Sequence, residues 1–341
     1  MTYQDIAELL KTQPYDFLRA DPRLGDRIIL LGLGGSYAYG TNIEDSDVDI
    51  RGVALNSKEE ILLGRPFEQV LDNVTDTTVY SFTKFVKLLT EANPNILELL
   101  FLDEDQYLYL SPVGKELIEK RELFLSERVM YSFGGYARAQ LSRLDNKAMR
   151  NLDQPGQEEH ILHSVQNAYM TFPDKYFSFP EDAIRLYIDD SDRDDMVSEI
   201  FMDVTLKHYP LRDYKCMWSE MHNIVKEYGK IGKRAKSAMR RDIAKHGMHV
   251  LRLQDQCLEM LMTGTMHTRR TEDHDLLMDI RNGKYTDDNG QMTDAFFDIV
   301  RENDRKIKEA AALGKLPKKP DYKGIEAFVC DVNEKIIRGE L

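Results

Sequence analysis

The chain has 341 residues and a formal net charge of −13 at pH 7, from 46 Lys and Arg against 59 Asp and Glu. Its 42% hydrophobic and 31% charged residues argue against wholesale disorder, and the length predicts two domains, with one large domain as the alternative. Because the overall charge repels polyanions, any nucleotide or nucleic acid must be met by a local basic patch, a metal ion or both.

Neither the cysteines nor the hydropathy pattern indicates secretion or membrane insertion. Cys216, Cys257 and Cys330 are odd in number and far apart, which is not typical of a disulfide framework. No run approaches about 18 uncharged apolar residues, and residues 1–27 lack a signal-peptide pattern. We therefore expect a cytoplasmic protein without membrane insertion.

The first hundred residues predict short strands and short helices in alternation. Apolar runs bounded by glycine or by turn residues indicate the strands, and capping residues mark where helices begin. In chain order we expect a helix over 2–10, strands over 27–33 and 47–55, a helix over 57–63, strands over 67–71 and 76–82, and helices over 79–92 and 95–101.

From about residue 112 onward the periodicity is mostly helical, with strong helices expected over 214–228, 235–262 and 322–337. The exception is 183–209, which predicts a hairpin with an acidic tip. Strands first and helices later indicate an α+β fold. We expect a mixed-sheet domain over 1–115, and a mainly helical domain over 116–341 that carries the hairpin and closes a cleft over the first.

The stretch LGLGGSYAYGTNIEDSDVDIRGV, residues 31–53, joins a glycine turn to a pair of carboxylates. Gly35 lets the backbone approach a phosphate closely, and Ser36 adds a hydroxyl and an N–H. Asp47 and Asp49 are two residues apart, so in a strand both carboxylates leave the same face. Two converging carboxylates call for a cation, and Mg²⁺ takes one or two carboxylates together with substrate phosphates.

This stretch resembles the signature of the DNA polymerase beta-like nucleotidyltransferase superfamily, in which a Gly-Ser pair is followed after a loop by Asp-apolar-Asp-apolar. GSYAYGT, SDVDIRGV and ANPNILELLF occur in that order and are similar to a bacterial and phage branch of predicted nucleotidyltransferases. VTLKHYPLRDY, AKHGMHVLRL and LLMDIRNGKY in the helical part resemble the same branch. The resemblance implies a third carboxylate on a neighbouring strand, for which Asp76 is our choice and Asp72 the alternative.

The resemblance also implies a nucleotidyltransferase fold and a two-metal mechanism with Mg²⁺, or alternatively Mn²⁺. Gly35 and Ser36 would hold the β- and γ-phosphates of an NTP or dNTP. Asp47 and Asp49 would bind both metals, and Asp76 the metal that activates the acceptor hydroxyl. In-line attack on the α-phosphate would then release pyrophosphate.

Basic side chains supply further nucleotide-binding candidates. Arg51 would share the face of Asp49, where it either neutralises phosphate or pairs with a carboxylate. Lys245, His249 and Arg252 fall on one polar stripe of the helix over 235–262. A solvated helix face has the same pattern, but related enzymes place a helical-domain lysine on the triphosphate. That likeness favours Lys245 first, then His249 and Arg252.

Positive charge is concentrated in residues 226–245, where eight basic residues stand against two acidic ones. This segment is +6 in a chain of −13, which leaves −19 elsewhere. We therefore expect a nucleic-acid end or a growing oligonucleotide as acceptor, bound from Lys230 to Arg241.

Three other functions stay open. The first two are a protein-modifying enzyme that transfers AMP, and an oligonucleotide-signal-making enzyme. Either would belong to an anti-phage or toxin–antitoxin system, with a protein partner encoded nearby. The third is a non-catalytic nucleotide-sensing module. The intact pair of aspartates and the Gly-Ser pair argue against this last class, because a sensor does not need every metal ligand.

Overall fold

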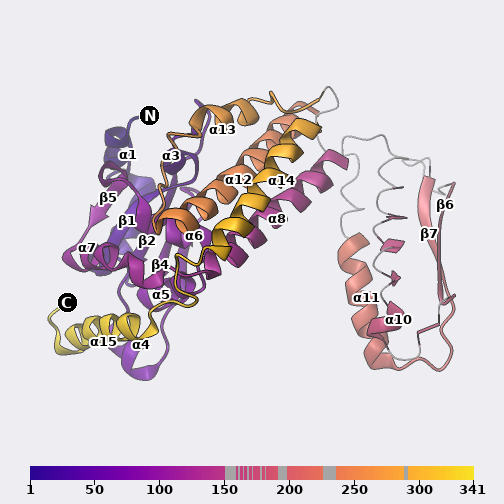
Figure 1. Cartoon of the computed structure of the whole chain (residues 1–341). Helices are drawn as coiled ribbons and strands as arrows, with labels where there is room; N and C mark the ends of the chain where they lie inside the picture. Colours follow the sequence, from indigo (N-terminus) through magenta and orange to yellow (C-terminus); the bar gives the residue numbers. More distant parts are fainter. Residues whose placement is uncertain are drawn as a thin grey trace. The chain divides into compact units, whose positions relative to one another are not determined.

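A computed structural model gives the fold of the chain (Figure 1). The residues it describes are 1–149, 159, 162–163, 165–166, 169–170, 172–176, 179–180, 182–190, 198–225, 236–287 and 291–341.

The chain forms two compact units. We call Met1–Leu141, Lys245–Tyr285 and Asp294–Leu341 the sheet unit, and Ser142–Ala244 with Thr286–Thr293 the hairpin unit. This division differs from the predicted boundary between residues 115 and 116, because two later segments pack with the N-terminal residues. The physical reason is a shared core. Leu253 and Leu261 from one late helix and Phe328 from another are buried together with Leu30 and Phe82 of the sheet region.

The sheet unit is built on a mixed five-stranded sheet in the order β3-β4-β2-β1-β5. Its strands are β1 (Ile28–Gly34), β2 (Asp49–Ala54), β3 (Gln69–Asp72), β4 (Thr77–Ser81) and β5 (Tyr107–Leu110). β2 pairs antiparallel with β1 and parallel with β4, with Ile50 opposite Thr77. The parallel pairing brings the beginnings of β2 and β4 to one edge of the sheet.

Helices of the sheet unit begin where capping residues predict. Thr2 and Ser57 each form a capping box at the N-terminus of a helix, and Gly264 has a left-handed φ of +76° just beyond α12. The helices are α1 (Tyr3–Leu9), α2 (Phe17–Ala20), α3 (Gly35–Tyr39), α4 (Lys58–Leu63), α5 (Phe82–Thr90), α6 (Pro94–Leu97), α7 (Pro112–Glu119), α8 (Arg128–Met149), α12 (Lys236–Thr263), α13 (His274–Arg281), α14 (Asp294–Ala312) and α15 (Tyr322–Arg338). The end of α8, from Ser142, and the beginning of α12, up to Ala244, belong to the hairpin unit.

The long helix α12 is held by its neighbours on two sides. Gln254 donates hydrogen bonds to α14, to the carbonyl of Val300 at 3.2 Å and to Asp304 at 2.7 Å. On the side of α8, Nδ1 of His246 lies 2.7 Å from Oε1 of Gln140. α12 is therefore fixed by polar contacts with both α14 and α8.

The hairpin unit contains the predicted hairpin, formed by the antiparallel strands β6 (Ile184–Asp190) and β7 (Ser198–Val204). It also contains α10 (Phe172–Lys175) and α11 (Leu211–Val225), and a small core includes Phe172 and Met217. The predicted acidic tip, 191–197, lies outside the described residues. The α+β fold with a mixed sheet, a hairpin and a helical C-terminal region is thus confirmed. Among the described residues, no helix combines the length and apolarity that crossing a membrane requires.

Candidate functional site

The turn after β1 brings the backbone of Gly35 against the carboxylate of Asp49. α3 begins at Gly35, whose φ of +57° lies in the left-handed region. A β-carbon at this position would overlap Oδ2 of Asp49, so both the backbone conformation and the available space require glycine. Ser36 follows and is buried, with 9% of its surface exposed. Three of the predicted site residues therefore lie at one turn.

Arg51 joins the carboxylates that stand at the beginnings of two neighbouring strands. Its Nη2 lies 3.1 Å from Oδ1 of Asp49, and its Nη1 lies 3.5 Å from Oδ1 of Asp76. Nη1 also donates to the backbone carbonyl of Asp76 at 2.8 Å. Of the two roles that the sequence leaves open for Arg51, the structure displays the pairing with carboxylates.

Asp47 and Asp72 differ from Asp49 and Asp76 in their surroundings. The β1–β2 ladder ends at the pair Gly34–Asp49, because α3 begins at the next residue. Asp47 therefore precedes β2, and strand alternation does not place its side chain on the face of Asp49. Asp72 instead shapes the β3–β4 turn, accepting hydrogen bonds from N and Oγ1 of Thr75, both at 2.8 Å.

The pair Asp49 and Asp76 has the donor chemistry of a magnesium site. Burial raises the pKa of Asp49 to about 6 against the opposing effect of Arg51, and the adjacent Asp76 raises it as well. Mg²⁺ takes one or two carboxylates and completes its shell with waters and substrate phosphates. The described residues contain no preassembled group of three or more metal-ligating side chains. Asp47 as a further ligand stays a prediction.

α12 presents two of the predicted nucleotide contacts to this site. The exposed Lys245 lies close enough to Asp49 for its charge to lower the pKa of that carboxylate. His249, one turn further, packs edge-on against Tyr39 with ring centroids 6.2 Å apart. Burial, then the charges of Arg252 and Lys245, hold the pKa of His249 well below its usual range. A neutral His249 brings no positive charge to a phosphate.

Arg252 is placed differently from Lys245, because it is only 3% exposed. Its guanidinium forms an ion pair with Glu98, donates to Oε1 of Gln256 at 2.8 Å and lies 3.7 Å from the ring centroid of Tyr39. The groups observed around Arg252 are therefore protein groups. Its predicted contact with nucleotide stays a prediction.

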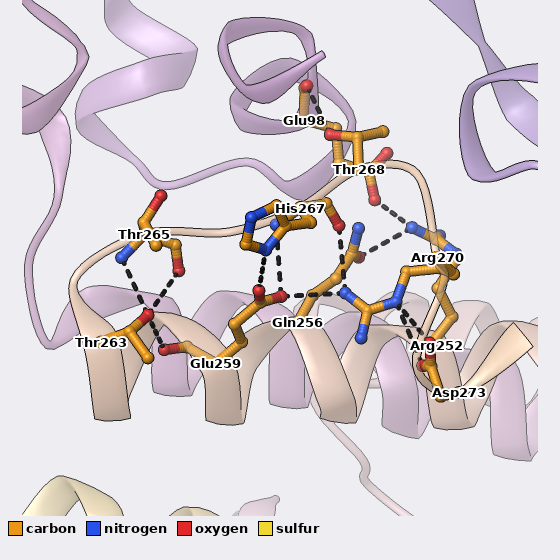
Figure 2. Close-up of polar contacts among 10 residues, drawn as sticks. All are labelled: Glu98, Arg252, Gln256, Glu259, Thr263, Thr265, His267, Thr268, Arg270 and Asp273. Atoms are coloured by element: carbon orange, nitrogen blue, oxygen red, sulfur yellow. Dashed lines mark hydrogen bonds and ion pairs between the residues drawn. The ribbon is translucent and has the colours of Figure 1, made fainter. Parts of the chain in front are cut away.

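The segment after α12 folds back along the helix through polar contacts (Figure 2). Arg270 pairs with Glu259 at 2.9 Å and with Asp273 at 3.0 Å, and Thr268 donates to the backbone carbonyl of Glu98 at 2.8 Å. The backbone N–H of Arg270 also donates to the carbonyl of Tyr39 at 2.9 Å. Hydrogen bonds and ion pairs thus connect this segment to α12 and to the end of α3, the helix that begins at Gly35.

Comparison with known proteins shows a similarity to one family in the N-terminal part of the chain. Residues 7–163, which contain all five strands of the sheet together with Gly35, Asp49 and Asp76, match the model of the RNA repair pathway DNA polymerase beta family. The match covers just under half of the chain and supports a DNA polymerase beta-like nucleotidyltransferase family. A protein of Enterobacteria phage T4, described as an uncharacterized 38.9 kDa protein in the nrdC-mobD intergenic region, is 26% identical over 162 residues. That match covers 44% of this chain and 46% of the phage protein, about half of each.

One basic residue near these side chains is not predicted from the sequence as a site residue. Arg281, at the end of α13, donates from Nη2 to Oγ of Ser46 at 3.2 Å, in the loop that carries Asp47. Its Nη1 is buried and has no hydrogen-bond partner among the described residues. Its charge is also close enough to His249 to lower the pKa of that imidazole. The sequence signal for Arg281 is its place in the run LLMDIRNGKY.

The basic segment predicted to bind an acceptor cannot be placed at this site. From Lys230 to residue 235 it lies outside the described residues, and from there to Arg241 the structure describes the helix but not the side chains. The predicted acceptor surface therefore stays a prediction.

Proposed function

We propose that this protein transfers a nucleoside monophosphate from an NTP or dNTP to an acceptor hydroxyl and releases pyrophosphate. The observation that carries the proposal is the position of Asp49. Its carboxylate lies against the backbone of Gly35, beside Asp76 and within reach of the charge of Lys245. A phosphate-accommodating turn, a pair of carboxylates and a nearby cation are the groups that phosphoryl transfer requires.

Asp49 and Asp76 would hold Mg²⁺, or Mn²⁺ in its place. When bound, the metal would neutralise charge on the phosphates and promote ionisation of the attacking hydroxyl. The two carboxylates fit this role because they share one edge of the sheet and already need a positive partner, which Arg51 provides.

The remaining groups of the site would bind and orient the phosphates. The backbone at Gly35 and the hydroxyl of Ser36 would lie along the β- and γ-phosphates, with no side chain at residue 35 to exclude them. Lys245 and Arg281 would offset the phosphate charge. Lys245 is exposed and its charge acts on Asp49, and Nη1 of Arg281 has no hydrogen-bond partner among the described residues. The neutral His249 would serve as a hydrogen-bonding group.

An RNA end is the acceptor that we favour. The family that residues 7–163 match is described by an RNA repair pathway, and the chain has one strongly basic segment for a polyanion. Transfer to a protein or to free nucleotides would use the same chemistry, so the acceptor needs a direct test.

The test is to incubate the protein with each labelled NTP and dNTP plus Mg²⁺, alone and with RNA or DNA oligonucleotides. We expect labelled RNA and pyrophosphate, and neither product with the Asp49→Asn variant. Label on the protein itself, or a short oligonucleotide formed without added RNA, would redirect the assignment to the alternative acceptors. Absence of nucleotide consumption, together with retained nucleotide binding, would support a sensing module instead.

A further inference from the structure

The polar stripe of α12 is divided by burial into two parts. Lys245 is exposed, whereas Arg252, two helical turns or roughly 10 Å further along the same face, is buried. The shared face therefore does not imply a shared role. Lys245 is accessible to a ligand from solution, while Arg252 contacts Glu98, Gln256 and Tyr39.

Tyr39 connects Arg252 to the Gly35 turn. Tyr39 is the last residue of α3, which begins at Gly35, and its side chain is 5% exposed. Its hydroxyl donates to Oε2 of Glu98 at 2.9 Å, while Arg252 pairs with Oε1 of the same carboxylate and covers the tyrosine ring. The three side chains therefore link α3, the turn of helix at Glu98 and α12 in one contact.

A buried ion pair such as Arg252–Glu98 is not explained by its contribution to the free energy of unfolding alone. Removing two charges from water costs several kcal/mol, and apolar side chains of similar size often stabilise a core as well or better. A buried ion pair can instead fix how two elements are placed against each other, here the register of α12 on α3. If α12 slid or rotated by one residue, the charge of Arg252 would lose Glu98 and remain unpaired in the core. Only one placement of α12 on α3 satisfies both groups.

We propose that Arg252 is a positioning residue that fixes the register of α12 on α3 through Glu98 and Tyr39. In this register His249 packs edge-on against Tyr39, with ring centroids 6.2 Å apart, and the exposed Lys245 lies one turn before His249 on α12. The proposal rests on the proposed function only where it concerns nucleotide. The placement of α12 is a property of the protein alone and can be measured without substrate.

The first measurement is a distance between spin labels. Lys245→Cys on α12 and Leu71→Cys on β3 provide exposed positions, in a background with Cys216→Ser and Cys330→Ser because these native cysteines are exposed. We expect a single narrow distance in this parent, a shifted or broadened one after Arg252→Gln, and partial recovery with Arg252→Lys. An unchanged narrow distance in Arg252→Gln would overturn the proposal.

Arg270→Gln is the matched control. Arg270 is also a largely buried arginine that pairs with two carboxylates, Glu259 on α12 and Asp273 before α13, and neither of these ion pairs involves Tyr39 or Glu98. We expect it to lower thermal stability and to leave the label distance unchanged. If both variants broaden the distance equally, Arg252 has only a general structural role. If Arg252→Gln does not fold, the double variant Glu98→Gln/Arg252→Gln tests the same register without an unpaired buried charge.

The second measurement is the affinity for ATP, made in unlabelled protein that retains Lys245. We expect Arg252→Gln to weaken ATP binding by about tenfold, and Arg252→Lys to recover part of the loss. Unchanged affinity in Arg252→Gln would contradict a role in placing Lys245. If the wild type binds no nucleotide, the proposed function fails, while the label distances still decide the positioning role.

Discussion

The carboxylate of Asp49 occupies the space into which a β-carbon on Gly35 would project. The two residues come from β2 and from the beginning of α3, and they are brought together by the antiparallel pairing that ends at Gly34 and Asp49. A phosphate-binding turn and a metal-binding carboxylate would therefore be fitted to one another directly.

Gly35→Ala should disturb the site more than its backbone conformation alone explains. Alanine at a φ of +57° is strained, and its methyl group must also displace Asp49. We expect a loss of about 1–3 kcal/mol in the free energy of unfolding and a loss of most activity, measured by denaturant titration and nucleotide transfer. Gly64→Ala is the control, because φ there is +61° with nothing within 4 Å of the added carbon. Full activity in Gly35→Ala would contradict the proposed fit.

Asp49→Asn and Asp76→Asn should each abolish nucleotide transfer, because amides replace the charges that would bind the metal. Asp72→Asn should retain activity, since Asp72 accepts hydrogen bonds within the β3–β4 turn and an amide oxygen can still accept them. Asp47→Asn tests the residue that the structure places outside β2. Transfer at half the wild-type rate in Asp49→Asn/Asp47→Asn would rule out these aspartates as metal ligands.

Lys245→Ala and Arg281→Ala should each weaken nucleotide binding by about 1–3 kcal/mol, the scale of a lost charged hydrogen bond. Isothermal titration with ATP and Mg²⁺ measures the change. Lys284→Ala is the control, because Lys284 lies just beyond Arg281 but is exposed and paired with Asp279 at 2.6 Å. Unchanged ATP affinity in Lys245→Ala would show that this stripe of α12 is an ordinary solvated helix face.

Sequence periodicity predicts the face of α12 but not the neighbours of each turn. Lys245, His249 and Arg252 share a stripe in the sequence, and the structure separates them because Glu98, 154 residues before Arg252, pairs with its guanidinium. The same limit explains Arg281. No local pattern indicates that the end of α13 meets the loop at Ser46. Contacts between distant segments decide which basic residue reaches the site.

The strands show a related limit. The alternation in residues 47–55 and the family motif predict β2, but the beginning of β2 depends on β1, whose pairing stops at Gly34. Asp47 is therefore outside the strand. The sequence does not predict β5 (Tyr107–Leu110). This strand has only four residues, lies at the edge of the sheet and does not alternate between buried and exposed positions. The two compact units depend on packing between residues far apart, which periodicity cannot indicate.

Asp255→Asn should make stability less dependent on pH. Burial, together with the charge of Asp273, raises the pKa of Asp255 to about 7, while Arg270 opposes the shift. A carboxyl whose pKa is raised on folding loses stability as pH increases from its unfolded value through the folded value. Asparagine avoids this loss and can still accept the hydrogen bond that Asn303 donates at 2.8 Å.

We therefore expect Asp255→Asn to exceed the wild type by about 1–3 kcal/mol in the free energy of unfolding at about pH 8, with little gain at about pH 5. Comparing the two proteins at each pH cancels the contribution of His249, whose lowered pKa acts in the opposite direction. The exposed Asp298→Asn on α14 is the control. An equal difference at both pH values would contradict a raised pKa at Asp255.

The basic segment predicts where a nucleic-acid acceptor binds. Residues 226–245 carry +6 while the rest of the chain carries −19, so a polyanion is attracted to this segment and repelled elsewhere. Phosphate contacts release counterions, and acceptor binding must therefore weaken steeply with salt. Changing Lys233, Arg234 and Arg240 to Glu should abolish RNA binding in a gel-shift or anisotropy titration and leave ATP affinity unchanged.

If the wild type consumes nucleotides but binds neither RNA nor DNA at low salt, the acceptor is a free nucleotide or a protein. The segment would then be a surface for a protein partner.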